Sequence, residues 1–236
     1  NDNNFINLNL KKIIQLKENN FIIKILNTHK NTFEVKDFNN LSITDLLHRQ
    51  QTNPSNNLMK LAINNKNIIV TGAAGSIGNT ILKQLLNYNP SSILCIDASE
   101  IGIYNLMEKY RDDSRVSYKL GNLLDIKFVE NIFNSCQIDL VFHTAAYKHV
   151  NIIEDNVAIG IKNNIISTYN LLKSCYNSEI QEFVLISSDK AVRSSNIMGA
   201  TKKFAEKIVL FFNKKYHDEG KNINYKIVRF GNVLES

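Results

Sequence analysis

The sequence contains few prolines, glycines and cysteines, and each shortage excludes a class of protein. Only 2 prolines and 9 glycines occur among 236 residues, which excludes collagen-like and proline-rich chains. The 3 cysteines, Cys95, Cys136 and Cys175, are odd in number and far apart. They therefore predict neither a disulfide framework nor a CxxC metal site, and a reducing cytoplasm suits them best.

Long apolar runs are also missing. Every apolar stretch, including residues 68–86, is interrupted by glycine or polar residues before it reaches the roughly 18 consecutive apolar residues that a membrane-spanning helix needs. No secretory signal is present. The chain starts at Asn1 without a methionine, so we expect it to be a soluble fragment of a longer protein.

The charge balance favours an anionic ligand or simply good solubility. Lys and Arg number 28 against 22 Asp and Glu, which gives a net charge of +6 and a pI near 9.1. Nucleic acid is not a predicted partner, because the basic residues are dispersed and no zinc-finger, RRM or basic-zipper pattern accompanies them. No metal site is predicted either, since His143 and His149 lack helical i, i+4 spacing and a nearby acidic co-ligand.

Two regions differ in composition, and we expect a boundary near Asn64. Residues 1–64 are rich in Asn, and residues 53–57 have the turn chemistry of a linker, so this region is predicted to be a linker and the tail of a preceding domain. Residues 65–236 form the second region. Within the first region the pattern predicts a helix end at 10–17, a strand at 21–26 and a short helix at 42–49.

From residue 67 onward, apolar runs typical of strands alternate with amphipathic segments typical of helices. This alternation predicts an α/β fold with right-handed crossovers and a doubly wound parallel sheet, in which ligands bind outside the carboxyl ends of the strands. The predicted strands are 68–71, 92–97, 115–120, 139–143, 182–187 and 225–230. The predicted helices are 77–88, 100–110, 125–134, 157–176 and 198–216, the last ending near Gly220.

A glycine-rich loop follows the first of these strands. Residues 71–78 read Thr-Gly-Ala-Ala-Gly-Ser-Ile-Gly and open onto a predicted helix, which is the dinucleotide-binding arrangement. Such a loop needs a tight turn at Gly72, a bare backbone for pyrophosphate at Gly75 and close helix packing at Gly78, while the helix N-terminus supplies amide donors. We therefore assign the cofactor loop to Gly72, Ala74, Gly75, Ser76, Ile77 and Gly78.

The residue at the end of the second strand indicates which dinucleotide binds. Asp97 stands 19 residues after Gly78, where an acid accepts hydrogen bonds from the adenosine ribose and repels a 2′-phosphate. No cation follows Asp97 until Lys109, so NAD is predicted rather than NADP. A strand-end turn acid is the alternative interpretation of Asp97. Asn122 and Leu123, after the third strand, either hold the adenine edge or form a plain turn.

The catalytic helix lacks a tyrosine where one is usual. Short-chain dehydrogenases with this loop usually carry Tyr-x-x-x-Lys on a helix, where i and i+4 share one face and the lysine lowers the tyrosine pKa. Here Met198 precedes Lys202 at that spacing, and a thioether cannot transfer a proton. At the end of the fifth strand, Asp189 and Lys190 place a carboxyl and an amine side by side. The base is therefore another group, or the protein is inactive.

Five segments together resemble a known family. They are TGAAGSIG (71–78), HTAAYKHV (143–150), SSDKAV (187–192), NIMGATKK (196–203) and RFGNVL (229–234). They are similar to the nucleotide-sugar 4,6-dehydratases of bacterial polysaccharide synthesis, within the extended short-chain dehydrogenases. The likeness covers residues 42–236. More narrowly, the segments resemble the large membrane-anchored UDP-N-acetylglucosamine 4,6-dehydratases, in which Met also replaces Tyr. It implies a homo-oligomer whose full-length chain is anchored at the cytoplasmic face of the inner membrane.

The resemblance also implies roles for particular residues. Lys202 would bond the nicotinamide ribose, Ser188 would contact the sugar near its 4-hydroxyl, and Asp189 with Lys190 would form the acid–base pair. Ala145 and Ala146 would line the cofactor site. Near the substrate the resemblance places Tyr147, Lys148, Asn164 and Asn232, of which Asn164 would hold local backbone and water. Solvated or core side chains are the alternative for Lys148, Lys190 and Met198.

Some features depart from the family pattern. Ser194 replaces a common Pro, Ser167 and Glu235 replace Gly, and Asn122 replaces Asp, but no catalytic group is lost. The chain stops at Ser236, so most of the sugar-binding region is expected to be missing, and the fragment is expected to bind NAD with little turnover.

The expected function is therefore a UDP-N-acetylglucosamine 4,6-dehydratase. A UDP-sugar 4-epimerase is the alternative enzyme, and Met198 leaves open a non-catalytic NAD-binding regulator. In the expected mechanism Asp189 acts first as base and later as acid, which requires partial burial to raise its pKa, and Lys190, desolvated beside the cofactor, takes the C5 proton.

Overall fold

The computed structural model describes residues 24–26, 38–40, 55–178, 180–221, 223–231 and 233, and it divides the chain into two units, Asn1–Ser55 and Asn56–Ser236. In the first unit β1 (Lys24–Leu26) pairs antiparallel with β2 (Phe38–Asn40). Strand β1 lies within the strand expected at 21–26. The helical segments expected at 10–17 and 42–49 lie outside the described residues.

The second unit begins earlier than the boundary expected near Asn64. Helix α3 (Asn56–Ile63) occupies part of the stretch that the sequence suggested as a linker. Ile63, at the end of this helix, is 2% exposed and packs into the core beside the sheet. Burial of this side chain explains why α3 belongs with the second unit.

A six-stranded parallel sheet forms the centre of the second unit and confirms the doubly wound fold. The strand order is β5-β4-β3-β6-β7-β8, so the chain moves outward from β3 in one direction and then returns to add β6, β7 and β8 on the other side. The strands are β3 (Asn67–Thr71), β4 (Ser92–Asp97), β5 (Val116–Leu120), β6 (Leu140–His143), β7 (Glu182–Ser188) and β8 (Asn224–Phe230).

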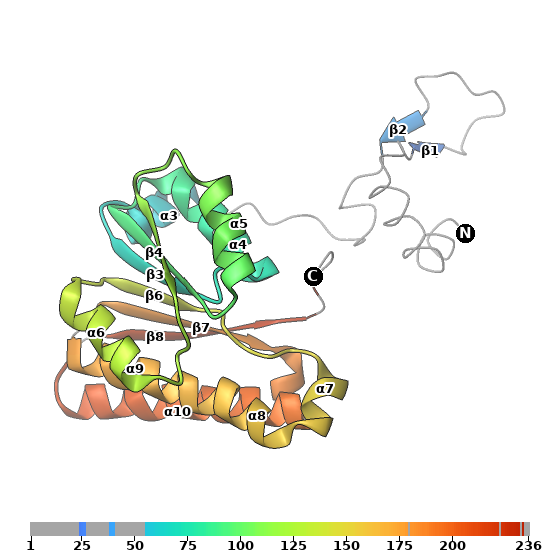
Figure 1. Cartoon of the computed structure of the whole chain (residues 1–236), viewed down its shortest axis with the longest axis vertical. Coiled ribbons are helices and arrows are strands. Elements are labelled where there is room, and N and C mark those ends of the chain that lie inside the picture. The colour runs from blue at the N-terminus through green and yellow to red at the C-terminus, as the bar shows by residue number, and fades with distance from the viewer. Residues whose placement is uncertain are drawn as a thin grey trace. The chain divides into compact units, whose positions relative to one another are not determined.

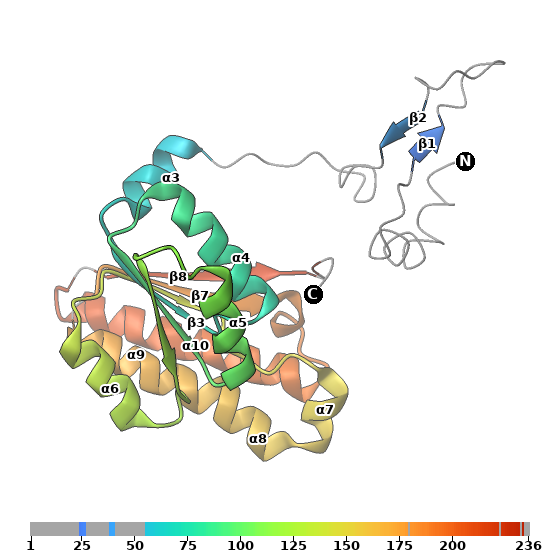
Figure 2. The ribbon, with the colours of Figure 1, turned by 45° about the horizontal axis from the view of Figure 1, so that its top comes forward.

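Helices cover both faces of this sheet, as Figures 1 and 2 show, with α3, α4 and α5 on one side and α6, α9 and α10 on the other. Their bounds are α4 (Ser76–Leu85), continued by the 3₁₀ turn η2 (Leu86–Tyr88), α5 (Glu100–Lys109), α6 (Ile126–Ser135), α9 (Ser167–Ser178) and α10 (Ile197–Asp218). No helix among the described residues is both long enough and apolar enough to cross a membrane.

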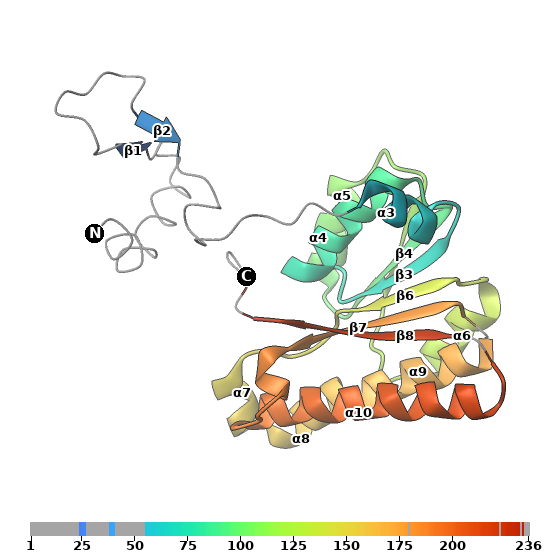
Figure 3. The same cartoon turned by 180° about the vertical axis from the view of Figure 1, so that it is seen from behind.

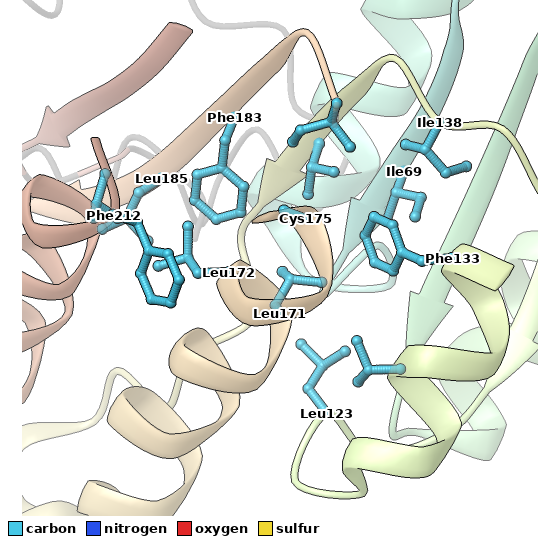
Figure 4. Packing of buried hydrophobic residues seen from close by; sticks show 14 of the residues in the cluster. Ile69, Leu123, Phe133, Ile138, Leu171, Leu172, Cys175, Phe183, Leu185 and Phe212 are labelled. Carbon is cyan, nitrogen blue, oxygen red and sulfur yellow. The ribbon is translucent and has the colours of Figure 1, made fainter. Parts of the chain in front are cut away.

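Neighbouring residues of a strand point to opposite faces, and here both faces are buried. Ile69 packs into the core under α6, α9 and α10, which Figure 4 shows with Phe133, Leu171 and Phe183, whereas Val70 packs into the core on the α4 side. Both residues are fully buried. This two-sided burial explains the continuous apolar runs from which the strands could be predicted.

The helix expected over 157–176 is interrupted. The structure contains α8 (Val157–Ile161), a π-helical turn η3 (Lys162–Ile166) and then α9. A short helix that the sequence did not predict, α7 (Val150–Asp155), precedes them. The extra residue per turn in a π-helix redirects side chains, and such turns occur often at functional sites. The turn at η3 contains Asn164, whose side chain bonds the backbone of Tyr147 in the site described next.

Candidate active site

A cavity of about 850 Å³ lies at the carboxyl ends of the central strands, where the chain order of the sheet reverses. Figure 3 shows β6, β7 and β8 running toward α7 at that end of the sheet. The cavity is lined by the glycine loop, by the segment after β6, and by residues from the ends of β7 and β8 and the start of α10. The structure thus brings together residues from all five segments that carried the resemblance, with Phe230, Gly231 and Val233 from the last one.

Each of the three loop glycines is required for a different steric reason. Gly72 has φ of +66°, and a Cβ there would lie 2.6 Å from the Ala145 backbone nitrogen. A Cβ at Gly78 would lie 2.2 Å from the Gly72 carbonyl oxygen, so α4 packs directly on the loop. Gly75 is different, because its Cβ would meet only that same carbonyl, at 3.3 Å, and Gly75 lines the cavity. The loop therefore presents bare backbone to the cavity, as an approaching pyrophosphate requires.

Asp97 supports the loop from β4. Its Oδ2 accepts a hydrogen bond from the Ala74 backbone N–H at 3.0 Å, and its Oδ1 accepts from the Ser99 backbone N–H at 2.9 Å. Each carboxylate oxygen can accept a further hydrogen bond. Its turn role is therefore present in the structure, and its predicted role at the ribose remains compatible with these contacts.

The residues assigned to the adenine edge have structural roles in the turn after β5. Asn122 is exposed, and its Oδ1 accepts from the Leu124 backbone N–H at 2.9 Å, whereas the Leu123 side chain is buried in the core. Asn170 of α9, which the sequence did not single out, donates to the carbonyls of Leu123 at 3.0 Å and Leu124 at 3.2 Å. Neither Asn122 nor Leu123 lines the cavity, and their role at the adenine stays a prediction.

Lys202 and Met198 both reach the cavity from α10. Lys202 is 7% exposed, and its Nζ donates to the Ile186 carbonyl of β7 at 2.6 Å. Burial lowers the pKa of Lys202 to about 8, and the negative charge of Glu206 opposes this effect. Met198 is 4% exposed and lies one turn earlier on the same cavity wall. Met198 is therefore both a buried side chain and part of the cavity lining.

The predicted acid–base pair, Asp189 and Lys190, lies at the rim of the cavity and not in its interior. Ser188 and Lys190 line the cavity, whereas Asp189 is not part of the lining. The Asp189 side chain is 57% exposed, and Lys190 Nζ lies 3.5 Å from its Oδ1. Ser188 Oγ donates to that oxygen at 3.0 Å. The segment forms the 3₁₀ turn η4 (Asp189–Ala191) directly after β7.

These contacts contradict one expectation from the sequence. The Ser188 hydrogen bond and the Lys190 charge hold the pKa of Asp189 below its ordinary value, so the expected rise through partial burial is wrong. That expectation failed because η4 leaves the Asp189 side chain 57% exposed at the end of β7. The Lys190 side chain is 39% exposed and lines the cavity, and its desolvation beside a bound cofactor stays a prediction.

The residues expected near the substrate fall into three groups. Tyr147 is 49% exposed and, like Lys148, lines the cavity. Asn164 is 1% exposed and does not line it; its Oδ1 accepts from the Tyr147 backbone N–H at 2.8 Å, and its Nδ2 donates to the Tyr147 carbonyl and to Thr201 Oγ1, each at 3.0 Å. Asn164 therefore holds the backbone of Tyr147 in place. Asn232 lies outside the described residues. Of the two alanines, Ala146 lines the cavity and Ala145 packs against Gly72.

A buried histidine beside the site was not predicted to have a role. His143, at the end of β6, is 1% exposed, with Nδ1 at 2.7 Å from Thr71 Oγ1 and Nε2 at 2.9 Å from Thr168 Oγ1. Thr168 donates its own proton to the Asn164 carbonyl at 2.8 Å, so His143 Nε2 must donate to Thr168 and Nδ1 must accept from Thr71. Burial, together with the charge of Lys202, lowers the pKa of His143 to about 3.

His143 makes stability depend on pH. Its pKa is about 3 when folded against 6.5 ordinarily, so between these values the unfolded chain binds a proton that the folded chain does not. Stability therefore falls as pH drops through this window, and we expect His143 to contribute a slope of about 1 kcal/mol per pH unit. Urea unfolding from pH 7 to pH 4 measures it. We expect His143→Gln to flatten the slope and the exposed control His217→Gln to leave it unchanged; equal slopes in all three proteins would contradict the assignment.

Comparison with known proteins places the chain in a family. The model of the family described as polysaccharide biosynthesis protein matches residues 68–236. The chain belongs to this family.

Among the described residues, no cluster of three or more His, Cys, Asp or Glu is placed to hold a metal ion.

Individual relatives of the family are similar over most of this chain. The capsular polysaccharide biosynthesis protein CapD of Staphylococcus aureus is 35% identical over 86% of this chain and 34% of its own length. An inverting UDP-N-acetylglucosamine 4,6-dehydratase of Campylobacter jejuni is 31% identical over 73% of this chain and 51% of its own length. The chain thus spans about a third to a half of the length of these curated relatives.

Solved structures show the same fold. The structure of Pen from Bacillus thuringiensis superposes with a TM-score of 0.68 at 31% identity, covering 73% of this chain and 52% of that one. The Bordetella bronchiseptica enzyme WbmF, solved in complex with NAD⁺, superposes with a TM-score of 0.61 at 19% identity, covering 73% of this chain and 52% of that one. These likenesses agree with the nucleotide-binding sheet predicted from the sequence.

Proposed function

We propose that this family member is the cofactor-binding core of an NAD-dependent nucleotide-sugar 4,6-dehydratase. Its substrate is UDP-N-acetylglucosamine, and its product is a UDP-4-keto-6-deoxy sugar for capsule, O-antigen or other glycan synthesis. The observation that carries the proposal is the convergence of the glycine loop, Lys202 and the Ser188–Lys190 turn on one cavity. The similarity to an inverting dehydratase of Campylobacter jejuni supports the same reaction.

The residues present fit NAD. The glycine loop leaves bare backbone at Gly75, and Asp97 at the end of β4 suits a ribose hydroxyl and repels a 2′-phosphate. Lys202, which is buried and lines the same cavity, offers an ammonium for the nicotinamide ribose. The chemistry that NAD supplies when bound is hydride acceptance from sugar C4 and hydride return to C6, with no net redox change.

The residues of η4 supply the proton transfers. Asp189 has a pKa below its ordinary value, so it is ionised at neutral pH and can accept the proton from the 4-hydroxyl. Lys190, after losing its own proton to solvent, takes the C5 proton that the 4-keto group has made acidic. The protonated Asp189 then gives its proton to the departing C6 hydroxyl, which leaves as water, and Lys190 returns a proton to C5. A substrate that covers the exposed pair would desolvate it and so favour these later steps.

One experiment distinguishes the dehydratase from two other functions, a 4-epimerase and a non-catalytic regulator. A 4-epimerase needs a base for C4 but no separate pair for C5 and C6, so the Asp189–Lys190 pair favours the dehydratase. A regulator would bind NAD without turnover. Mass spectrometry of the full-length protein incubated with UDP-N-acetylglucosamine distinguishes them: loss of 18 Da identifies a dehydratase, an isomer of unchanged mass identifies an epimerase, and an unchanged substrate overturns the proposal. Membrane anchoring and homo-oligomerisation belong to the same proposal for the full-length protein.

Cofactor preference is a direct test of Asp97. We expect the wild type to bind NAD at least tenfold more tightly than NADP, about 1.4 kcal/mol, because the Asp97 carboxylate would face the 2′-phosphate. Calorimetric titration measures both affinities. Asp97→Asn keeps the size of the side chain and is expected to narrow the preference, whereas Glu100→Gln, at the exposed start of α5, is a control that should not change it. Equal wild-type affinities for the two cofactors would refute the assignment.

A further inference from the structure

Beneath the lysine that faces the cofactor lies an ionic cluster that does not belong to the proposed acid–base machinery. Glu206 of α10 is 4% exposed. Its Oε1 accepts from Ser187 Oγ at 2.6 Å and from Arg229 Nε at 2.9 Å, and its Oε2 accepts from Arg229 Nη2 at 2.6 Å. The Arg229 side chain is 48% exposed, so the cluster runs from the core to the surface.

The cluster is built next to Lys202. Residues four apart share one face of a helix, which makes Glu206 the next residue below Lys202 on α10. Lys202 holds the Ile186 carbonyl of β7, and Glu206 holds the side chain of the following residue, Ser187. Two successive residues of β7 are thus attached to two successive turns of α10. Arg229 attaches β8 to the same carboxylate.

Burial and the neighbouring charges have opposite effects on the pKa of Lys202. Burial disfavours the charged form and lowers its pKa to about 8, and Glu206 acts in the opposite direction. His143 of β6 is neutral at physiological pH and adds no positive charge. Arg229 of β8 contacts the Glu206 carboxylate, and the Asp189–Lys190 pair of η4 lies at the exposed rim.

Arg229 keeps the buried carboxylate ionised. Burial raises the pKa of Glu206, but the hydrogen bonds from Arg229 and Ser187 and the nearby positive charges outweigh it, so the pKa lies below its ordinary value. An ionised group this deeply buried is stable only with such partners. Glu206 therefore carries a negative charge at the pH at which Lys202 begins to lose its proton.

We propose that Glu206 is a positioning residue that keeps the Lys202 side chain cationic and fixed at the end of β7, where it meets the cofactor ribose. Ser187 fixes the Glu206 carboxylate at the end of β7, whereas Arg229 bonds it from the surface side, and the positive charge of Arg229 opposes the effect of Glu206 on Lys202. The inference rests on the proposed function and extends it. It names Glu206 as the residue that keeps Lys202 protonated, and so keeps NAD bound, as the pH rises.

The test observes Lys202 directly, in protein without cofactor. Proton–carbon NMR of protein labelled in its lysine side chains follows the titration, and Lys202→Arg identifies the signal. We expect a wild-type midpoint near pH 8 and a midpoint lower by about one pH unit or more in Glu206→Gln, the shift typical of losing one close opposite charge. Glu206→Asp, which retains the charge, should shift the midpoint less.

Arg229→Gln separates an electrostatic role from simple packing. It removes a positive charge from the cluster, so the Lys202 midpoint should stay or rise, opposite to the effect of Glu206→Gln. If Glu206 and Arg229 only held the packing around Lys202, without an electrostatic effect, both variants would shift the Lys202 midpoint in the same direction. If Glu206→Gln fails to fold, the double variant Glu206→Gln, Arg229→Gln removes both charges together, and it should still lower the midpoint.

NAD affinity measured from pH 6 to pH 9.5 gives the second readout. We expect affinity to fall as pH rises through about 8 in the wild type and to begin falling at lower pH in Glu206→Gln. An unchanged Lys202 midpoint in Glu206→Gln, or a midpoint lowered by Arg229→Gln, overturns the proposal. A wild type that binds no NAD overturns the proposed function instead, because the titration of Lys202 needs neither cofactor nor substrate.

Discussion

Replacing Lys190 with alanine, or Asp189 with asparagine, is expected to lower dehydratase turnover in the full-length protein by roughly 10² or more. This is the usual contribution of a group that transfers a proton in the transition state. Each change removes one proton acceptor, and both residues lie on η4, outside the glycine loop that would hold NAD. Rates of product formation should therefore fall while NAD affinity, measured by calorimetric titration, stays within about twofold.

Isotope exchange and one control variant separate the two roles. Lys190→Ala should abolish solvent deuterium exchange at C5, because no other amine lies beside Asp189 on η4. Met198→Ala, which alters the buried cavity wall without removing an acid or base, should cost much less than Asp189→Asn. If Met198→Ala proves as damaging while the fold and NAD binding survive, the base is not Asp189.

The second large effect is expected at Gly78. An added methyl group there would lie 2.2 Å from the Gly72 carbonyl oxygen and 2.8 Å from Ala73 Cα, and backbone on both sides cannot move aside. We expect Gly78→Ala to lower the free energy of unfolding by about 3 kcal/mol, the upper range for overpacking, and to weaken NAD binding more than about 10²-fold because the loop must shift. Urea unfolding and calorimetric titration give the two quantities.

Gly75→Ala is the matched control within the same loop. Its methyl group would meet only the Gly72 carbonyl, at 3.3 Å, so the free energy of unfolding should change by less than about 1 kcal/mol. NAD affinity should nevertheless fall about tenfold or more, since the methyl group projects where the pyrophosphate must approach bare backbone. Wild-type NAD affinity in Gly75→Ala would show that the pyrophosphate does not lie against this residue.

The strands, the glycine loop and their order could be predicted from the sequence because each depends on local information. A strand buried on both faces must be apolar throughout, as β3 and β4 are, and a helix that packs on a loop needs glycine at the contact, as Gly78 shows. Spacing along the chain also places Met198 and Lys202 on one helical face. These features need no knowledge of distant residues.

The remaining features depend on which distant segments meet. The π-turn at η3 was not predicted, because a local pattern predicts only a continuous helix. The resemblance implied that Asn164 holds local backbone, but only the structure identifies its partner as Tyr147, 17 residues away. The exposure of Asp189 follows from the path of the chain after β7, which apolar spacing does not encode.

The sequence by itself determined the sheet, the dinucleotide loop and the family. Only the tertiary structure decided the charge states around the site. The neutral form of His143, the lowered pKa of Lys202 and the buried Glu206–Arg229 pair all arise from desolvation and from charges that β6, β7, β8 and α10 bring together. Desolvation and Coulomb interaction depend on distance in space, and distance in space becomes known only when the chain has folded.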